Sequence, residues 1–201
     1  VKFFALSGRI INSWILNELL ACTPPLIIFI NGKGKKLPFP KFSNNGNEIV
    51  WGSIGNASTS QGVFFESVNA CGVLQIPAVI SIWDDEYGIS VDNKYHTTKE
   101  SISKALNGFK LTKNQSGIEI LKVKGWDYAS LIKTYSYAEN IARNYHVPVI
   151  IHVTELTQPL GHSTSGSHER YKSKKRLEWE KSVDCIKMMK TLDTDSFDHC
   201  V

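Results

Sequence analysis

The sequence has 201 residues, of which 42% are hydrophobic and 21% charged. This composition is typical of a globular domain and excludes a disordered tail, a fibrous repeat and a disulfide-dense mini-protein. A net charge of +4 is too small to indicate nucleic-acid binding without a basic patch. The cysteines share no CxxC spacing, so neither a zinc site nor a redox dithiol is indicated, and we expect idle thiols. They are Cys22, Cys71, Cys185 and Cys200.

No segment has the pattern of a membrane span. The most apolar stretch, residues 25–30, is far shorter than the ~20 residues that a spanning helix needs. An apolar region before Cys22 is interrupted by Asn12, Asn17 and Glu18, whereas the core of a signal peptide is continuously apolar. We therefore expect a cytoplasmic protein with no membrane partner.

The first 47 residues form a segment with few signals. The pattern predicts a helix from Ile10 to Leu20 and a strand over 26–30. The loop SNNGNE at 43–48 marks a boundary, because a run of Asn and Gly interrupts regular structure. The sequence thus divides into an unassigned segment 1–47, a domain 48–190 and a tail 191–201.

Within the domain, short apolar runs alternate with amphipathic stretches. The runs predict strands over 49–54, 77–82, 118–123 and 147–153. The amphipathic stretches predict helices over 63–74, about 98–106 and about 174–190, and one that follows a capping Asp127. The apolar face of this last helix would carry Leu131, Ile132, Tyr135, Ala138, Ala142 and Tyr145. This order predicts an α/β fold, with a parallel sheet and helices on both faces.

Three polar, glycine-containing loops each follow a predicted strand, at 55–62, 84–88 and 157–173. The carboxyl ends of parallel strands meet at one edge of the sheet, where ligands bind in such folds. Small residues in the first loop would let an anion approach the start of the next helix, although the loop fits no phosphate-binding signature. A plain turn explains that loop equally well.

The acidic run Asp84-Asp85-Glu86 lies at the end of the second strand. It is either a solvated rim or part of a cation site. Mg²⁺ takes oxygen ligands, commonly one or two carboxylates beside substrate phosphates. One carboxylate from this run and the amide oxygen of Asn56 would lie at adjacent strand ends.

Residues 55–90 resemble the thiamine-diphosphate motif in the alpha subunit of 2-oxoacid dehydrogenases. The loop GHSTSGSHERYKS at 161–173 resembles the His-Ser-Thr-Ser loop of the same family, which closes over the diphosphate. The residues of both motifs are most similar to those of the bacterial branched-chain type, and the resemblance covers about 48–190. The matching residues of the first motif are Gly55, Ser60, Gly62, Glu66, Asn69, Pro77, Tyr87, Ile89 and Ser90.

This resemblance implies a thiamine-diphosphate-binding fold and a set of site residues. Mg²⁺ would be held by Asn56, Asp85 and the backbone oxygen of Tyr87. The family has an acid at the position of Asn56 and an Asn at the position of Asp85, so the two are exchanged and the site still has one carboxylate. His162 would be the catalytic residue, near the cofactor and the acyl acceptor. The cofactor-binding residues would be Gly55, Asn56, Ala57, Ser58, Asp85, Tyr87, Ile89, His162 and Ser163.

The implied reaction is the oxidative decarboxylation of a branched-chain 2-oxoacid, with acyl transfer to a lipoyl group. The partners would be a beta-type subunit or half, which supplies the activating glutamate, and a lipoyl-bearing acyltransferase component. Because the beta half is missing from these residues, we expect the chain to be a fragment.

Several residues depart from the family pattern. Gln61 replaces a Glu, Gln158 falls where many relatives have Arg, and Glu86 replaces a small residue, usually Gly, in a turn. An inactive remnant that binds at most a partner therefore stays an alternative. A second alternative is a magnesium-dependent phosphohydrolase that uses Asp84 and Asp85. The basic stretch Lys172, Lys174, Lys175 and Arg176 is interpreted as a solvated helix start, with carrier docking as its alternative.

Overall fold

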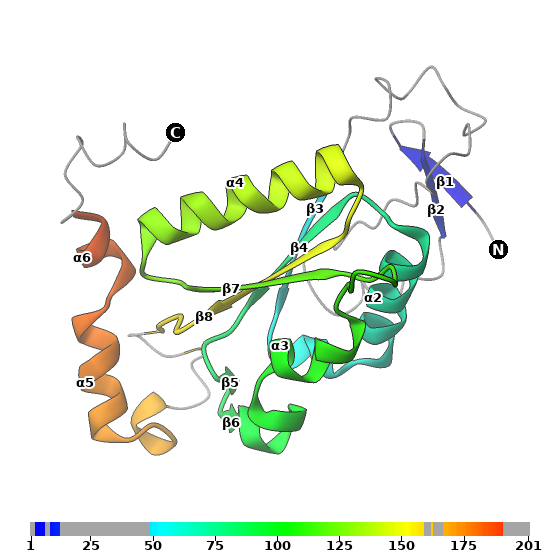
Figure 1. Ribbon diagram of the computed structural model, residues 1–201. Helices are drawn as coiled ribbons and strands as arrows, with labels where there is room; N and C mark the ends of the chain where they lie inside the picture. Colours follow the sequence, from blue (N-terminus) through cyan, green and yellow to red (C-terminus); the bar gives the residue numbers. More distant parts are fainter. Residues whose placement is uncertain (1–2, 7–8, 13–48, 159–161, 163–166, 191–201) are drawn as a thin grey trace.

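The computed structural model describes residues 3–6, 9–12, 49–158, 162 and 167–190. Its centre is a four-stranded sheet in the order β3-β4-β8-β7, in which every neighbouring pair is parallel (Figure 1). Val50 pairs with Ala78 and Val79 with Val149. The predicted parallel α/β sheet is therefore confirmed. The strands are β3 (Val50–Gly55), β4 (Ala78–Trp83), β7 (Glu119–Lys124) and β8 (Val149–Thr154).

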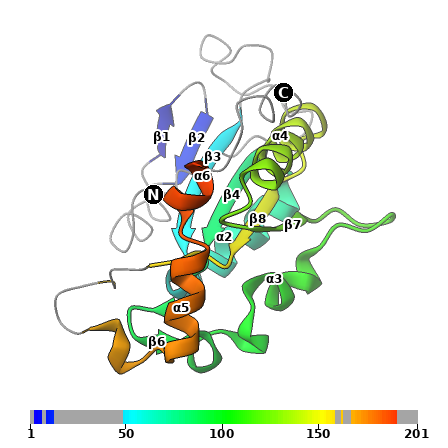
Figure 2. The same cartoon turned by 90° about the vertical axis from the view of Figure 1, so that its left-hand side faces the viewer.

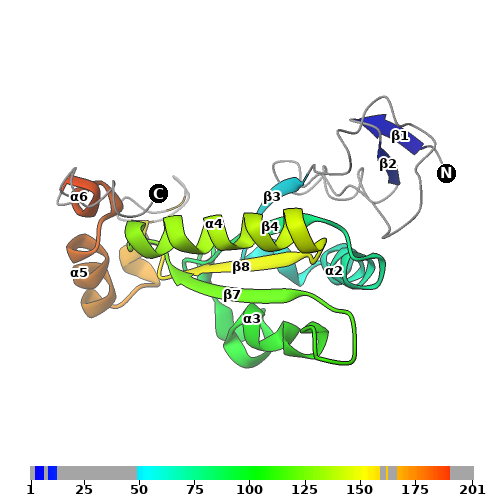
Figure 3. The same cartoon turned by 45° about the horizontal axis from the view of Figure 1, so that its top comes forward.

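Helices cover both faces of the sheet. Helix α4 (Tyr128–Tyr145) lies on one face, and α2 (Gly62–Leu74) and α3 (Ile102–Ala105) lie on the other (Figures 1 and 3). Beyond the carboxyl ends of the strands are α5 (Lys174–Ser182) and α6 (Cys185–Lys190). This layering fits the fold implied by the resemblance, since parallel strands need crossover helices on their faces.

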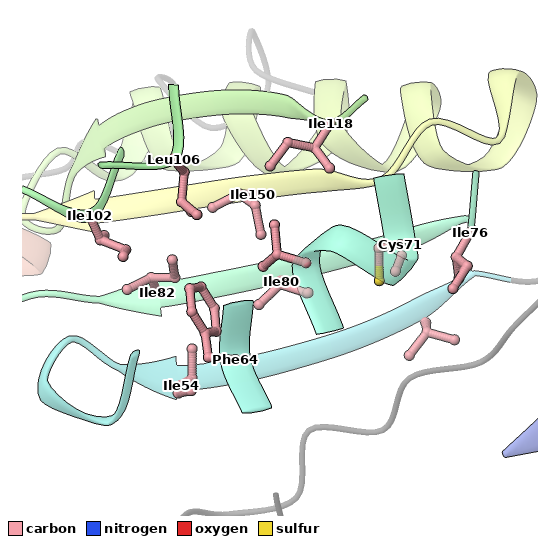
Figure 4. Packing of buried hydrophobic residues seen from close by; sticks show 13 residues of the cluster. Ile54, Phe64, Cys71, Ile76, Ile80, Ile82, Ile102, Leu106, Ile118 and Ile150 are labelled. Carbon is pink, nitrogen blue, oxygen red and sulfur yellow. The ribbon is translucent and has the colours of Figure 1, made fainter. Parts of the chain in front are cut away.

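Two apolar clusters hold these layers together, one on each face. In β4 and β8, successive side chains point to opposite faces, so Ile80 and Ile150 join the cluster under α2, whereas Val79 and Ile151 join the cluster under α4. Figure 4 shows the first cluster, in which Phe64 of α2 lies against isoleucines of the sheet. Both faces of these strands are buried, which explains why they read as mostly apolar runs.

Cys71 belongs to the first cluster and is 1% exposed. Burial raises the pKa of its thiol to about 12, so the thiol stays protonated and unreactive at neutral pH. This fits the expectation of an idle thiol for Cys71.

Short elements complete the described ranges. A two-stranded antiparallel hairpin, β5 (Tyr87–Gly88) with β6 (Val91–Asp92), follows β4 directly, and β1 (Phe3–Leu6) pairs antiparallel with β2 (Arg9–Asn12). Single 3₁₀ turns are η2 (Ala57–Ser60), η3 (Asn93–Tyr95), η4 (Thr98–Glu100), η5 (Leu106–Phe109) and η6 (His168–Arg170). Among the helices of the described ranges, none has the length and apolar character to cross a membrane.

Three predicted helices need correction. Residues 10–12 form part of strand β2, and the rest of the helix predicted over 10–20, like the strand over 26–30, lies outside the described residues. The helix over 98–106 is divided into η4, α3 and η5, because Lys99 and Glu100 have positive φ and Ser101 is extended. The helix over 174–190 is interrupted at Val183, after which Asp184 caps α6 by accepting from the backbone N of Lys187.

The sequence correctly predicts the start of α4, but two of the six residues predicted for its apolar face lie outside the packed cluster, the half-buried Ile132 and the exposed Tyr145. Leu131, Tyr135, Ala138 and Ala142 pack against the sheet. Tyr145 is instead 60% exposed, because it lies at the last turn of the helix, beyond the edge of the packed cluster.

Asp127 provides a test of this helix start, because its carboxylate accepts a hydrogen bond from the backbone N of Ser130 at 3.0 Å. Asp127→Ala should lower the free energy of unfolding by about 1 kcal/mol at pH 7. The hydrogen bonds from Ser130 hold the pKa of Asp127 below its usual 3.8, so the stabilisation is present above that pH and is lost as the pH falls through the folded-state pKa. Urea titrations at neutral and acidic pH would measure both effects, with Asn114→Ala in an exposed loop as control. An equal loss at both pH values would contradict the capping role.

Candidate functional site

A pocket of about 830 Å³ opens at the carboxyl ends of β3, β4 and β8. The three loops predicted to share one rim all contribute to it, so that prediction is confirmed for the described residues. The pocket is lined by Gly55, Asn56, Ala57, Ser58, Gln61, Trp83, Asp85, Tyr87, Gly88, Ile89, Leu156, Thr157, Gln158 and His162.

Backbone hydrogen bonds extend the sheet into these loops and position the first polar residues. The backbone N of Asn56 donates to the carbonyl of Trp83 at 3.0 Å, and the backbone N of Asp84 donates to that of Val153 at 2.9 Å. Asn56 and Asp84 therefore leave their strands at adjacent points. Turn η2 then follows Asn56, held by Thr59 Oγ1, which donates to the Asn56 carbonyl at 2.5 Å.

The three residues proposed to hold a cation meet around the backbone of Tyr87. Asn56 Nδ2 donates to the Tyr87 carbonyl at 3.1 Å, and the backbone N of Tyr87 donates to Asp85 Oδ1 at 3.2 Å. All three residues line the pocket. They thus bring one carboxylate, one amide and one carbonyl to the same wall.

Asp84 faces away from this wall, into the protein. It is 3% exposed, and its carboxylate accepts hydrogen bonds from the backbone N of Glu86 at 2.7 Å and from Asn93 Nδ2 at 3.0 Å. His152 Nε2 lies 2.7 Å from its second oxygen. Burial alone would raise the pKa of Asp84, but these hydrogen bonds and the charge of His152 outweigh it and lower the pKa. The carboxylate is fully engaged, so a phosphohydrolase that uses Asp84 is not supported.

Asp85 has the opposite electrostatic environment. Burial raises the pKa of its carboxyl group above the usual value, and the negative charge of Asp84 adds to this effect. The hydrogen bond from Tyr87 N and the positive charge of Lys172 act in the opposite direction without cancelling it. A cation at this wall would favour the ionised form of Asp85, because a nearby positive charge stabilises a carboxylate.

Glu86 occupies a turn position with φ 71°, in the left-handed region that disfavours a side chain. The sequence comparison predicted a turn that favours glycine here, and this backbone confirms it. The strain is offset by Arg176 of α5, which forms an ion pair with Glu86 and donates from Nη2 to the Asp85 carbonyl at 3.0 Å. Figure 2 shows α5 beside the β5–β6 hairpin, which begins directly after Glu86. Helix α5 thus holds the 84–88 loop in place.

The interpretation of the basic stretch as a solvated helix start is wrong for Lys172. Its side chain is 1% exposed, and Nζ donates to Glu180 Oε1 at 2.7 Å, which also accepts from Arg176 Nε at 2.8 Å. The Lys172 ammonium also lies 5.1 Å from the centre of the Tyr87 ring. The interpretation is also wrong for Arg176, whose side chain is 15% exposed and pairs with Glu86 and Glu180. Lys174 and Lys175 are exposed, as expected. No local pattern distinguishes Lys172 from its neighbours, because Glu180, eight residues later, looks like an ordinary helix-surface acid.

Other predicted site residues also reach the pocket. Gly55, Ala57 and Ser58 line it at the start of the first loop, and Ile89 lines it with φ 60°. His162 lines it and is exposed, which leaves its imidazole accessible to a ligand. Ser163 lies outside the described residues. Asn56, Asp85, the small-residue loop and His162 therefore all line one pocket.

Two site-supporting residues were missed by the sequence reasoning. His152 is the one polar side chain in the apolar run of β8, and its pairing with Ile82 on β4 brings it beside Asp84. A histidine within an apolar run is the sequence signal that could have identified His152. Asn93 follows the hairpin and had no distinguishing pattern, yet it lies 5% exposed between Asp84 and Asn56.

The oxygen atoms that this wall presents fit a hard cation that also binds a diphosphate. A carboxylate, an amide and a backbone carbonyl are the oxygen ligands that Mg²⁺ takes, and the ion keeps further positions for phosphate or water. The Tyr87 carbonyl accepts one hydrogen bond from Asn56 Nδ2 and retains a second lone pair for a cation. The pocket wall thus has the chemistry for a cation, and a diphosphate would bind through the positions that the cation leaves free.

The chain is similar to one protein-family model and to several known proteins. Residues 32–195 match the family model described as the dehydrogenase E1 component, a range that encloses the predicted domain 48–190. The chain is 26% identical over 153 residues to the pyruvate dehydrogenase E1 component subunit alpha of Rickettsia bellii. The aligned region covers 76% of this chain and 44% of that protein. It is 27% identical over 180 residues to the subunit of the same name from Staphylococcus epidermidis, and the aligned region covers 86% of this chain and 45% of that protein. It thus spans less than half the length of these relatives. The family match extends over most of the chain, and the chain therefore belongs to the dehydrogenase E1 component family.

Proposed function

We propose that the protein containing this chain binds thiamine diphosphate with Mg²⁺ and catalyses the oxidative decarboxylation of a 2-oxoacid. The observation that carries this proposal is the convergence of Asn56, Asp85, the Tyr87 carbonyl and His162 on one pocket. The family match and the names of the similar proteins support the same reaction class. Bound there, the cofactor would supply the electron sink for loss of CO₂.

In this proposal the residues of the chain bind and orient. Asn56, Asp85 and Tyr87 would hold the cation, while Gly55, Ala57, Ser58 and Ile89 would contact the cofactor. His162, exposed at the pocket, would act on the acyl group during its transfer to a lipoyl group of an acyltransferase component. Ser163 would lie beside it. The protein would work in the cytoplasm.

A beta-type partner belongs to the same proposal. Ile89, Val91 and Tyr95, on and after the β5–β6 hairpin, are between 46% and 75% exposed. Exposed apolar residues gathered near a pocket are typical of surfaces that a partner covers. This partner would supply the glutamate that activates the cofactor.

The substrate class is proposed to be a branched-chain 2-oxoacid. This proposal is supported by the residues of the two sequence motifs and by the apolar side chains of Trp83, Ile89 and Leu156, which line the pocket. The two similar proteins are named for pyruvate, so pyruvate is the competing substrate to test.

The experiment measures CO₂ release from 3-methyl-2-oxobutanoate and from pyruvate, with thiamine diphosphate and Mg²⁺. The chain alone should give no turnover, and the complex with a beta-type partner should turn over both, with the larger kcat/KM for the branched substrate. Turnover by the chain alone would refute the dependence on a partner. A larger kcat/KM for pyruvate would refute the branched-chain assignment.

An inactive remnant remains the second candidate, favoured by Gln158, a neutral residue in the pocket where many relatives have Arg. A neutral amide loses a charge-assisted contact to a phosphate. Calorimetric titration of thiamine diphosphate into the assembled complex separates the two candidates. The remnant predicts neither binding heat nor turnover, whereas the proposed enzyme predicts both.

A further inference from the structure

Trp83 is the largest residue on the pocket wall, and its side chain remains 56% exposed. It is the last residue of β4 and pairs with Gly55 of β3 on one side and Val153 of β8 on the other. Because alternate residues of a strand share a face, Trp83 points to the same face as Val79. Val79, Val153 and Leu156 form part of the apolar cluster under α4. The Trp83 ring therefore continues the apolar surface of this cluster into the pocket.

The orientation of the Trp83 ring is fixed from the side of the sheet. Its Nε1 donates to Ser81 Oγ at 3.0 Å, and Ser81 is 4% exposed. Ser81 Oγ in turn lies 2.5 Å from the hydroxyl of Tyr135 on α4. The Tyr135 ring stacks on Trp51 of β3, with 5.8 Å between the ring centres. Trp83 is thus an aromatic wall on a rigid strand, which places a contact more precisely than a loop does.

This hydrogen bond also decides which chemistry the ring offers to a ligand. The indole N–H is the only polar group of a tryptophan side chain, and it can only donate. Since Ser81 accepts from it, the part of the ring that faces the pocket is hydrocarbon, with no donor for a phosphate. The polar wall of Asn56, Asp85 and Tyr87 is a separate part of the same pocket. The Trp83 wall therefore suits an apolar group of the ligand.

We propose that Trp83, held by Ser81, is a specificity-determining residue that contacts the hydrocarbon side chain of the 2-oxoacid. This inference rests on the proposed function and assigns the branched-chain preference to one residue. The isopropyl group of 3-methyl-2-oxobutanoate would pack on the ring. The methyl group of pyruvate would be too short to reach it, and the benzyl group of phenylpyruvate would collide with it.

The test compares these three substrates in the assembled complex with thiamine diphosphate and Mg²⁺, in the wild type and in Trp83→Ala. The kcat/KM for 3-methyl-2-oxobutanoate should fall by about tenfold or more, as loss of contacts to one or two methyl groups typically costs. The kcat/KM for pyruvate should change by less than about threefold, because its methyl group makes no contact with the ring. The kcat/KM for phenylpyruvate should rise, because the space that the ring occupied becomes free.

A ring that only supports the fold, the cofactor or a partner would act on every substrate alike. Equal changes for the three substrates, or ratios that stay within twofold of the wild type, would therefore overturn the inference. If Trp83→Ala does not assemble, Trp83→Leu takes its place and must shift the ratios in the same direction. Failure of both variants to assemble would show that the ring is needed for the fold, and would also overturn the inference.

The role of Ser81 has a readout that needs neither cofactor nor turnover. In the full chain labelled with 5-fluorotryptophan, the ¹⁹F resonance of Trp83 is identified by its loss in Trp83→Ala. Ser81→Ala should shift and broaden this resonance, and should lower the preference for 3-methyl-2-oxobutanoate over pyruvate by a smaller factor than Trp83→Ala does. Ser53→Ala is the matched control, since Ser53 pairs with Ser81 on the neighbouring strand and lies on the same face of the sheet. This control should change neither readout, and an unmoved resonance in Ser81→Ala would refute the positioning role.

The outcomes separate this inference from the proposed function. A wild-type complex that prefers 3-methyl-2-oxobutanoate, with the same substrate ratios in Trp83→Ala, refutes the inference alone. A wild type that prefers pyruvate refutes the branched-chain substrate and the fit of its side chain to the ring. A wild-type complex that decarboxylates none of the three substrates refutes the proposed function, and the inference with it.

Discussion

Glu180→Ala should lower the free energy of unfolding by about 3–5 kcal/mol, the usual cost of removing one partner from a buried ion pair. Glu180 is fully buried and accepts hydrogen bonds from both Lys172 and Arg176. Without it, the Lys172 ammonium loses its carboxylate partner in a site where its side chain is 1% exposed. This loss is a large part of the ~5–15 kcal/mol that stabilises a typical domain.

Urea titration measures the effect, and Glu178→Ala is the matched control, since Glu178 is an exposed acid two residues away on the same helix. The control should change stability by less than about 0.5 kcal/mol. Adding Lys172→Met to Glu180→Ala should recover part of the loss, because the unpaired charge is removed. Equal effects of Glu178→Ala and Glu180→Ala would refute the structural role of this ion pair.

Asp85→Ala should abolish measurable decarboxylation by the complex, because it removes the single carboxylate of the proposed cation site. The affinity for Mg²⁺ in the presence of thiamine diphosphate should fall by about 100-fold or more, since loss of an outer-shell partner alone typically costs 10- to 100-fold. Asp85→Asn keeps an oxygen and should give an intermediate affinity. Calorimetry measures binding, and CO₂ release measures activity.

Asp92→Ala is the control for charge, as it removes an exposed acid from the neighbouring hairpin strand. Its complex should keep wild-type affinity and turnover. The thermal stability of Asp85→Ala should stay near that of the wild type or rise, since burial raises the pKa of this carboxyl group and its ionised form is therefore disfavoured in the fold. Unchanged Mg²⁺ affinity in Asp85→Ala would eliminate Asp85 as a ligand.

The sheet and the position of the site were predictable because they depend on local pattern and general topology. Apolar runs bounded by polar loops identify buried strands, and the connecting amphipathic stretches require parallel pairing. Parallel strands bring their carboxyl ends to one edge, so the loops at 55–62 and 84–88 could be placed together before any coordinates existed. The predicted strand 147–153 differs from β8 only at its ends.

Helix boundaries were less predictable where side chains from elsewhere decide the backbone. The 98–106 segment has a helical pattern, yet positive φ at Lys99 and Glu100 divides it into single turns. Glu86 likewise retains a left-handed turn without glycine because Arg176, ninety residues later, pairs with it. Local propensity contains no information about such distant partners.

By itself, the sequence determined the α/β fold and the edge of the sheet that carries the pocket, and both follow from short-range patterns. Its resemblance to a known family added the expectation that Asn56, Asp85, Tyr87 and His162 lie there. Only the tertiary structure decided which polar groups are buried and in which direction their hydrogen bonds run. Asp84 and Asp85 are neighbours with similar chemistry, yet one turns inward to His152 and Asn93 and the other lines the pocket. Lys172 and Lys174 diverge in the same way, because burial and pairing depend on the surrounding elements rather than on the residue type.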